Sequence, residues 1–347
     1  MPREREVALL GVLTVAAIGL GFAPRVFSQA STTTPSRSFT LTETIHIAPP
    51  ATRGGNLRVW IPMPYEETSQ GAGNAKLSGL DHWKMYTERE YRNRYAYGEI
   101  SAAALEHGAD IKATFHVQRF EHHAALEYET DVPGVPYSVT IRLLQPDHFV
   151  PIDGVVADVA QKTAGDAMLQ IDKARKVYNY VVANTKYEPR TDGLSTGETL
   201  KALYEKKGDS AEIAALFVAL ARSAGVRARC ETGYVLPSDA RSGALSEPHA
   251  WAQVYIAATG WVPVDAAAAI ENKSEREFYF GAVDANRVEI SAGRDIHLDP
   301  RQADGPLNYF VKAYAELDGK PYDGITTEYS FKDDSNSGPA TVTASAK

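Results

Sequence analysis

Three side chains, Ser210, His249 and Asp265, supply the groups that nucleophilic acyl transfer requires. A serine hydroxyl attacks a carbonyl when an imidazole removes its proton, and a carboxylate can orient that imidazole and stabilise its charge. His249 follows Ser210 by 39 residues and precedes Asp265 by 16. If the fold brings them together, these residue types allow a site in which Ser210 attacks, His249 is the base and Asp265 orients it.

Each of these residues also has a structural interpretation. Asp209 or Ser210 suits the N-cap of a helix, and Asp209 followed three residues later by Glu212 has the form of a capping box. His249 alone is typical of a surface or core histidine, and Asp265 of a cap or turn acceptor. Both interpretations stay open at the level of the sequence.

Other reactive groups have weaker support. Cys230 falls on a predicted strand, where free cysteines are commonly inert and buried. His122 and His123 beside Glu121 could bind a metal weakly, but neighbouring strand residues point to opposite faces, which favours a solvated strand end. The sequence has no glycine-rich nucleotide-binding run and no paired-histidine zinc motif. We expect no cofactor and no metal.

Elements that could position the three residues follow from periodicity. After Gly208 the apolar residues recur at helical spacing up to Ala224, and Gly225 supplies a stop. An earlier helix, with Asp166 as a possible cap, should end near Asn184. Extended segments are then predicted over 226–235, 250–257 and 261–264.

The first half of the chain alternates apolar and polar residues, as in Phe39 to Ile47 and Ile111 to Val117. This period is typical of half-buried strands, so residues 39–145 are predicted to form a β-rich, sandwich-like domain. The aromatic stretch from Trp83 to Tyr97 is interpreted as packing, with a binding surface as the alternative.

The ends of the chain have different compositions. Residues 1–30 combine charged residues, an apolar stretch and Ser28-Gln29-Ala30, which predicts a signal peptide and an exported, periplasmic or secreted protein. The alternative is an uncleaved anchor, which would be the chain's contact with a membrane. Residues 31–38 are predicted to be a flexible lead-in and 333–347 a disordered tail.

The charge balance restricts the partners. Lysine and arginine number 36 against 44 aspartate and glutamate, which gives a net charge of −8. This excess of acid argues against nucleic acid as the partner.

The run from Lys207 to Arg229, together with His249-Ala-Trp251 and Gly260-Trp-Val-Pro-Val-Asp265, resembles the transglutaminase-like superfamily, relatives of papain-type enzymes. The resemblance extends from about Pro151 to Phe310. It implies a papain-like α+β domain over residues 146–332 after the β-rich one. Val59 to Pro64 resembles part of the N-terminal extension that bacterial members often carry.

The resemblance also implies a cysteine at the start of the helix, paired with a histidine and an aspartate on neighbouring strands. In this sequence that position is Ser210. A thiol near pKa 8.5 can ionise beside an imidazolium at a helix N-terminus, whereas a hydroxyl cannot ionise as easily. A site shaped around sulfur would also place the Ser210 oxygen short of a carbonyl, and errors on the order of 1 Å cost about a hundredfold in rate.

Residues around the expected site receive supporting roles. Trp251 and Trp261 should pack around it, and Gln253, where relatives often have an acid, is interpreted as a solvent-facing strand residue. Arg287, Arg294 and Asp295 are interpreted as paired charges that brace a loop near the cleft, without a catalytic role.

Three functions follow. The first is a catalytically impaired relative, a pseudoenzyme, whose cleft binds peptide or protein segments. The second is a serine-based acyl transferase or amide hydrolase that uses Ser210, His249 and Asp265. The third is a structural module of a cell-envelope assembly. The sequence leaves the oligomeric state open.

Overall fold

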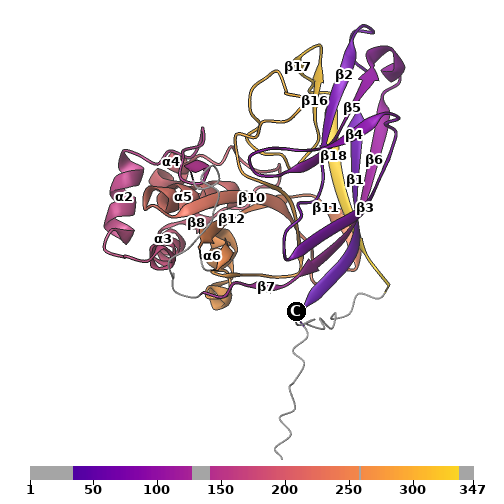
Figure 1. The fold of residues 1–347 in the computed structure, drawn as a ribbon. Coiled ribbons are helices and arrows are strands. Elements are labelled where there is room, and N and C mark those ends of the chain that lie inside the picture. Colours follow the sequence, from indigo (N-terminus) through magenta and orange to yellow (C-terminus); the bar gives the residue numbers. More distant parts are fainter. Residues whose placement is uncertain (1–33, 127–140, 258, 336–347) are drawn as a thin grey trace, which may run out of the picture. The chain divides into compact units, whose positions relative to one another are not determined.

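The computed structural model describes residues 34–126, 141–257 and 259–335 (Figure 1). The predicted signal peptide and the tail beyond residue 335 lie outside these residues. Residues 36–38 of the predicted lead-in belong to a strand, because β1 (Ser36–Ile47) already begins there. None of the described helices has the length and apolar character needed to cross a membrane.

The described elements are named in chain order as in Figure 1. The strands are β1 (Ser36–Ile47), β2 (Asn56–Pro62), β3 (Gln70–Ser78), β4 (Trp83–Thr87), β5 (Arg94–Ser101), β6 (Ala109–Phe120), β7 (His122–His123), β8 (Lys186–Tyr187), β9 (Lys207–Gly208), β10 (Arg227–Val235), β11 (Ser242–Leu245), β12 (Pro248–Ile256), β13 (Gly260–Val264), β14 (Ala282–Val283), β15 (Arg287–Ala292), β16 (Tyr314–Leu317), β17 (Lys320–Pro321) and β18 (Ile325–Asp333). The α-helices are α2 (Val155–Ala164), α3 (Gln170–Asn184), α4 (Thr199–Glu205), α5 (Ser210–Ser223) and α6 (Ala266–Glu271).

The predicted β-rich half is confirmed. Along β1 every second side chain is buried, which is the pattern of a strand with one face against a core. β1 belongs to a five-stranded sheet in the order β11-β18-β1-β6-β3, and a second sheet has the order β17-β16-β2-β5-β4. One hydrophobic cluster contains residues of both sheets, for example Leu41 and Val59. The two sheets therefore form a sandwich.

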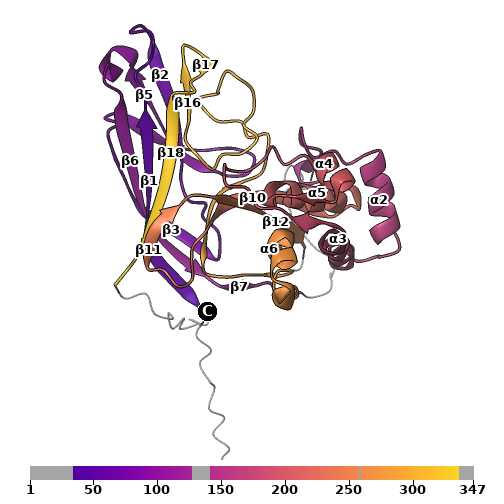
Figure 2. The ribbon, with the colours of Figure 1, turned by 180° about the vertical axis from the view of Figure 1, so that it is seen from behind.

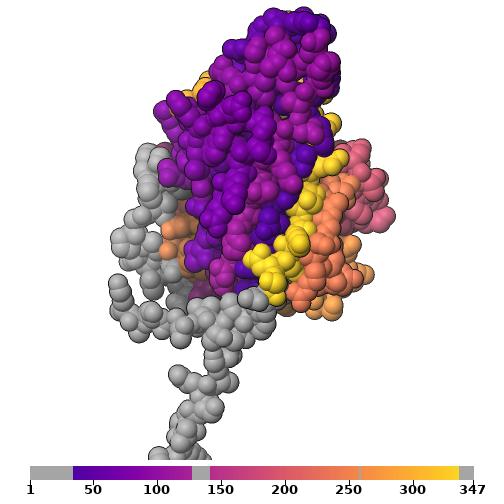
Figure 3. Space-filling view, turned by 90° about the vertical axis from the view of Figure 1, so that its right-hand side faces the viewer, coloured from indigo at the N-terminus to yellow at the C-terminus, as the bar shows by residue number. Residues whose placement is uncertain are grey.

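The expected boundary at residue 145 does not separate these sheets from the second half. β18 pairs antiparallel with β1 along its length, and β16 pairs with β2. Figure 3 shows β18 in yellow between the indigo β1 and the orange β11. Without β18, one side of β1 would be an edge with unpaired backbone groups. The C-terminal strands thus belong to the sandwich, and both halves belong to one compact unit.

The second half is built around α5. This helix is buried from Ser210 to Arg222, since it packs on β10 and β12 and is covered by α2, α3 and α4. A helix that is apolar on all sides requires such an enclosed position. The strands form a sheet in the order β13-β12-β10-β15. The helices gather at the end of the unit opposite to β1 and β18 (Figures 1 and 2).

The helix ends follow the sequence in two cases and depart from it in one. Asp209 and Glu212 form the predicted capping box of α5, and Gly225 has the positive φ of +85° that suits a helix stop. Asp166 does not cap α3, whose N-cap is Leu169. Asp166 lies three residues before this N-cap, and both its carboxylate oxygens accept from Lys176 of α3 at 2.6 Å.

The aromatic stretch of the first half is packed, as interpreted. The rings of Tyr86 and Tyr95 stack with their centroids 5.9 Å apart, and Trp60 lies 5.2 Å from Tyr97. Tyr91 and Tyr95 are buried in the same cluster.

The pairing of β18 predicts a stability effect far from the cleft. Phe331 of β18 packs edge to face on Phe39 of β1, with ring centroids 6.4 Å apart. We expect Phe331→Ala to lower the free energy of unfolding by about 3–4 kcal/mol, because it leaves a cavity between buried groups. Denaturant unfolding measures this, with the exposed Lys332→Ala as the matched control near zero. An equal effect of both substitutions would contradict the placement of β18.

Candidate active site

The N-terminus of α5 presents Ser210 at a fixed place. The short parallel pair β8-β9 leads into Asp209, whose carboxylate accepts the Glu212 amide at 3.0 Å. A Cβ at residue 208 would lie 2.7 Å from the Glu212 side chain, which explains glycine there. The capping box therefore holds Ser210, which is 3% exposed, on the first turn of the helix. The positive end of the helix dipole lies at the same point.

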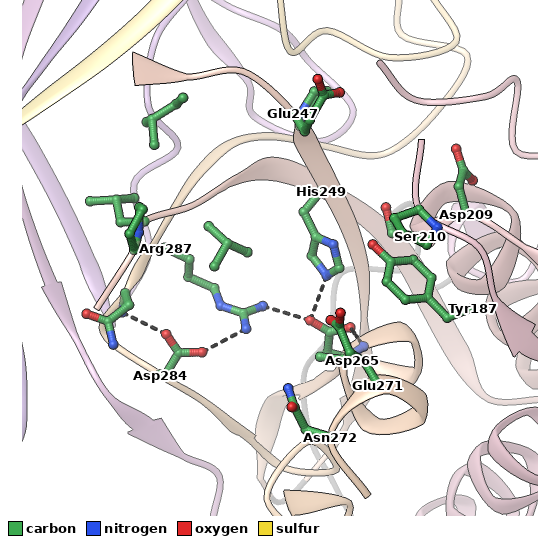
Figure 4. Close-up of a pocket in the computed structure, with 18 of the residues that line it drawn as sticks. Tyr187, Asp209, Ser210, Glu247, His249, Asp265, Glu271, Asn272, Asp284 and Arg287 are labelled. Atoms are coloured by element: carbon green, nitrogen blue, oxygen red, sulfur yellow. Dashed lines mark hydrogen bonds and ion pairs between the residues drawn. The ribbon is translucent and has the colours of Figure 1, made fainter. Parts of the chain in front are cut away.

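His249 and Asp265 form the closest pair of the expected site. His249 Nε2 lies 2.9 Å from Asp265 Oδ2. Because a carboxylate only accepts hydrogen bonds, Nε2 carries the proton of this contact, and Nδ1 is the ring nitrogen on the other side. Figure 4 shows the imidazole between Asp265 and Ser210. His249 enters on β12, and Asp265 is the N-cap of α6, where it accepts the Ala268 amide at 2.9 Å.

Asp265 is an ionised carboxylate in a buried position. Burial by itself would raise its pKa, but the ion pairs with His249 and Arg287 and the Ala268 amide outweigh burial and hold the pKa below its usual value. Arg287 Nη1 lies 3.0 Å from Asp265 Oδ2, and Nη2 lies 2.8 Å from Asp284. The predicted bracing role of Arg287 is thus a direct contact with the carboxylate that orients His249.

Ser210 lies in the same cleft, and its hydroxyl has a different partner. Ser210 Oγ accepts the backbone N–H of Ala250 at 3.1 Å. The hydrogen bonds of the described residues do not include one between Ser210 and His249. The structure therefore brings the three predicted residues to one place, with the hydroxyl held by the backbone of β12.

The cleft that contains these residues has a volume of about 830 Å³. Tyr187 lines it beside Ser210 (Figure 4). Burial, followed by the charge of Glu271, raises the pKa of Tyr187 to about 12, so the phenol stays protonated and can donate to a bound carbonyl. The sequence analysis missed Tyr187, because nothing in the sequence predicts that β8 pairs with the strand just before α5.

The interpretation of Gln253 as solvent-facing is wrong. This residue is 3% exposed, accepts from Arg229 Nη2 at 2.9 Å and donates to Glu67 Oε2 at 3.1 Å. Arg229 in turn lies 3.9 Å above the Trp261 ring. Gln253 is buried because the β-rich half covers this face of the sheet.

The remaining predictions can be placed as well. Trp251 is buried, and Arg287 lies 5.2 Å above its ring, as expected for packing around the site. Burial raises the pKa of the Cys230 thiol to about 11, which opposes a nucleophilic role. Arg294 donates to the Gly197 carbonyl at 2.8 Å and braces that loop.

The other two groups that the sequence analysis singled out are local contacts. Asp295 accepts the His148 amide at 2.7 Å. His123 contacts Glu121 at 2.8 Å, and the described residues contain no cluster suited to a metal ion.

Comparison with known proteins agrees with this architecture. Residues 157–266 match the model of the transglutaminase-like superfamily. The chain therefore carries a transglutaminase-like domain, with α5, β10, β12 and β13 as its centre.

Two relatives extend the likeness to most of the chain. A Haemophilus influenzae protein named "Uncharacterized protein" is 26% identical over 327 residues, which cover 83% of this chain and 88% of the relative. The structure of a "putative cysteine protease" from Cytophaga hutchinsonii matches with a TM-score of 0.54 and 16% identity, over 88% of this chain and 93% of that one. The second likeness shows a shared fold.

The buried carboxylate predicts a pH-dependent stability. The pKa of Asp265 is lowered by folding, so its contribution is fully present above the unfolded value near 3.9 and is lost as the pH falls further. We expect Asp265→Asn to cost about 3 kcal/mol at pH 7, because the variant breaks a buried ion pair, and less at about pH 3. Urea unfolding at both pH values measures this. A difference that does not shrink at the lower pH would contradict it, and the exposed Asp153→Asn is the control.

Proposed function

We propose that this protein is an exported member of the superfamily whose cleft binds peptide or protein segments without turning them over. The observation that carries the proposal is the state of Ser210. Its residue type replaces the cysteine that the family resemblance implies, and its hydroxyl accepts the Ala250 amide at 3.1 Å. The cleft around it keeps a volume of about 830 Å³, so the space for a ligand is retained while the thiol is absent.

The chemistry of the serine hydroxyl also supports binding without turnover. Cysteine enzymes of this geometry use a thiolate that is formed before attack, and a serine hydroxyl does not ionise in this way. The oxygen must instead lose its proton during attack to a base that lies within hydrogen-bond distance. His249 is not hydrogen-bonded to Ser210 among the described contacts, so this transfer lacks a prepared path.

A second candidate is a serine-based acyl transferase or amide hydrolase. The contact between His249 and Asp265 at 2.9 Å, supported by Arg287, favours it because a buried carboxylate of this kind is costly to keep. In this scheme Ser210 Oγ attacks the carbonyl carbon and its proton passes to His249 Nδ1. The Ser210 amide and the Tyr187 hydroxyl would then donate to the oxyanion.

Three forms of the protein separate these functions: the native chain, Ser210→Ala and Ser210→Cys. Each is assayed for amide hydrolysis and for amine incorporation at glutamine, and for peptide binding by calorimetry. We expect activity only in Ser210→Cys and comparable binding in all three forms, because the substitution restores the thiol without changing the cleft.

The opposite result would identify the second candidate. Turnover by the native protein that disappears in Ser210→Ala and in His249→Ala would establish serine catalysis and overturn the binding proposal. Absence of both turnover and binding in all three forms would contradict both functions.

A further inference from the structure

The cleft carries an excess of acidic side chains, which indicates the charge of its ligand. We propose that it selects a cationic peptide segment, with an ammonium or guanidinium group held between Glu247 and Glu271. This inference rests on the proposed function, since it names the ligand of the same cleft. Figure 4 shows Glu247 and Glu271 on opposite sides of His249 and Ser210.

The lining of the cleft is dominated by acids. Among the described residues it contains seven carboxyl side chains against two arginines. The carboxyl groups belong to Glu121, Asp209, Glu247, Asp265, Glu271, Glu275 and Asp284. The shape of the cleft defines the site independently of these charges.

Both arginines are already neutralised within the protein. Arg287 contacts the two carboxylates Asp265 and Asp284, and Arg190 lies 2.6 Å from Asp192. An anionic ligand would therefore have to compete with internal carboxylates for either cation. A ligand that enters the cleft therefore encounters a net negative charge.

Most of the buried acids are also committed to protein contacts. Asp209 accepts from Ser195 at 2.7 Å as well as from Glu212, and Asp265 is held by Arg287 and His249. These side chains shape the site and do not present free acceptor atoms to a ligand.

Three acids of the cleft, Glu247, Glu271 and Glu275, are exposed, and none of them has an ion pair among the described residues. The Glu275 carboxylate accepts the Tyr279 hydroxyl at 3.2 Å. Glu247 accepts one backbone amide, that of Gly193 at 3.2 Å. Glu271, the last residue of α6, lines the same cleft as Tyr187. The Glu247 and Glu271 carboxylates are available for a cation.

A cleft with low-dielectric walls strengthens this preference. Like charges along such a cavity focus the electrostatic potential and raise the local concentration of an oppositely charged ligand. Exposed ion pairs are individually weak, so we expect each glutamate to change the dissociation constant by about threefold and both together by about tenfold. The effect should fall as salt screens the charges.

A neighbouring cavity indicates that the cation is part of a peptide. This second cavity, of about 320 Å³, shares Gly193, Leu194 and Pro248 with the cleft. Its further lining is largely apolar and aromatic, and consists of Leu307, Tyr309, Val311, Ala313 and Tyr314 with Asp192 and Lys312. A ligand that crosses Leu194 could place an apolar side chain there and a cation in the main cleft. A free polyamine has no group for the second cavity.

Calorimetry on the full chain tests this inference. The probes are a capped peptide with lysines and one phenylalanine, the same peptide with glutamate in place of lysine, and spermidine. We expect the lysine peptide to bind at least about tenfold more tightly than both other probes, and more weakly at about 0.3 M salt. Glu247→Gln together with Glu271→Gln should weaken its binding by about tenfold. Glu205→Gln is the matched control, since Glu205 is exposed on α4 and does not line the cleft.

The outcomes separate the inference from the proposed function. Equal binding of the lysine and glutamate peptides, or binding that the double substitution does not change, would overturn charge selection and leave peptide binding intact. Spermidine that binds as tightly as the lysine peptide would overturn the assignment of a peptide. If no peptide binds to any form, the proposed function itself fails. Thermal unfolding checks the variants, whose substitutions replace exposed groups.

Discussion

The carboxylate of Asp265 connects three elements of the site, α6, β12 and β15. It caps α6, fixes the ring of His249 and pairs with Arg287, and it does this at 3% exposure. A buried negative charge is stable only where several donors converge. The fold must therefore place a donor from each of α6, β12 and β15 against this carboxylate. The position of His249 in the cleft is therefore a consequence of how three elements meet around one anion.

A second constraint lies where the β-rich half covers the sheet of the transglutaminase-like domain. Arg229 on β10 contacts Glu231, Gln253 and the hydroxyl of Tyr65. Gln253 continues this network to Glu67 in the first half of the chain. Polar groups that are buried in this way are costly unless each finds its partner. The contact between the halves is thus specific, which agrees with their forming one compact unit.

Local patterns were sufficient to predict much of this architecture. The alternation in β1 and the largely apolar sequence of α5 are properties of short segments, and so is the capping box at Asp209. The proximity of Ser210, His249 and Asp265 was reached through spacing and family resemblance. Local patterns could not predict that β18 pairs with β1, because nothing within either segment identifies its partner almost 300 residues away.

The same limit applies to single side chains at the site. Gln253 has a residue type that is typical of an exposed strand position. Its burial depends on a distant segment that covers it. Tyr187 reaches the cleft through the pairing of β8 with β9, which joins two short segments on either side of α4. The contact of Arg287 with Asp265 depends on where β15 joins the sheet. Each case is decided by tertiary arrangement and not by neighbouring residues.

The pairing of β1 with β18 also determines the order in which parts of this protein can fold during synthesis. Phe39 lies opposite Asp333, so β1 leaves the ribosome long before the segment that pairs with this edge. Until then the β1 backbone offers an open template to other strands, and contacts of such long range form slowly. The sandwich of a newly made chain therefore stays incomplete until β18 has been synthesised.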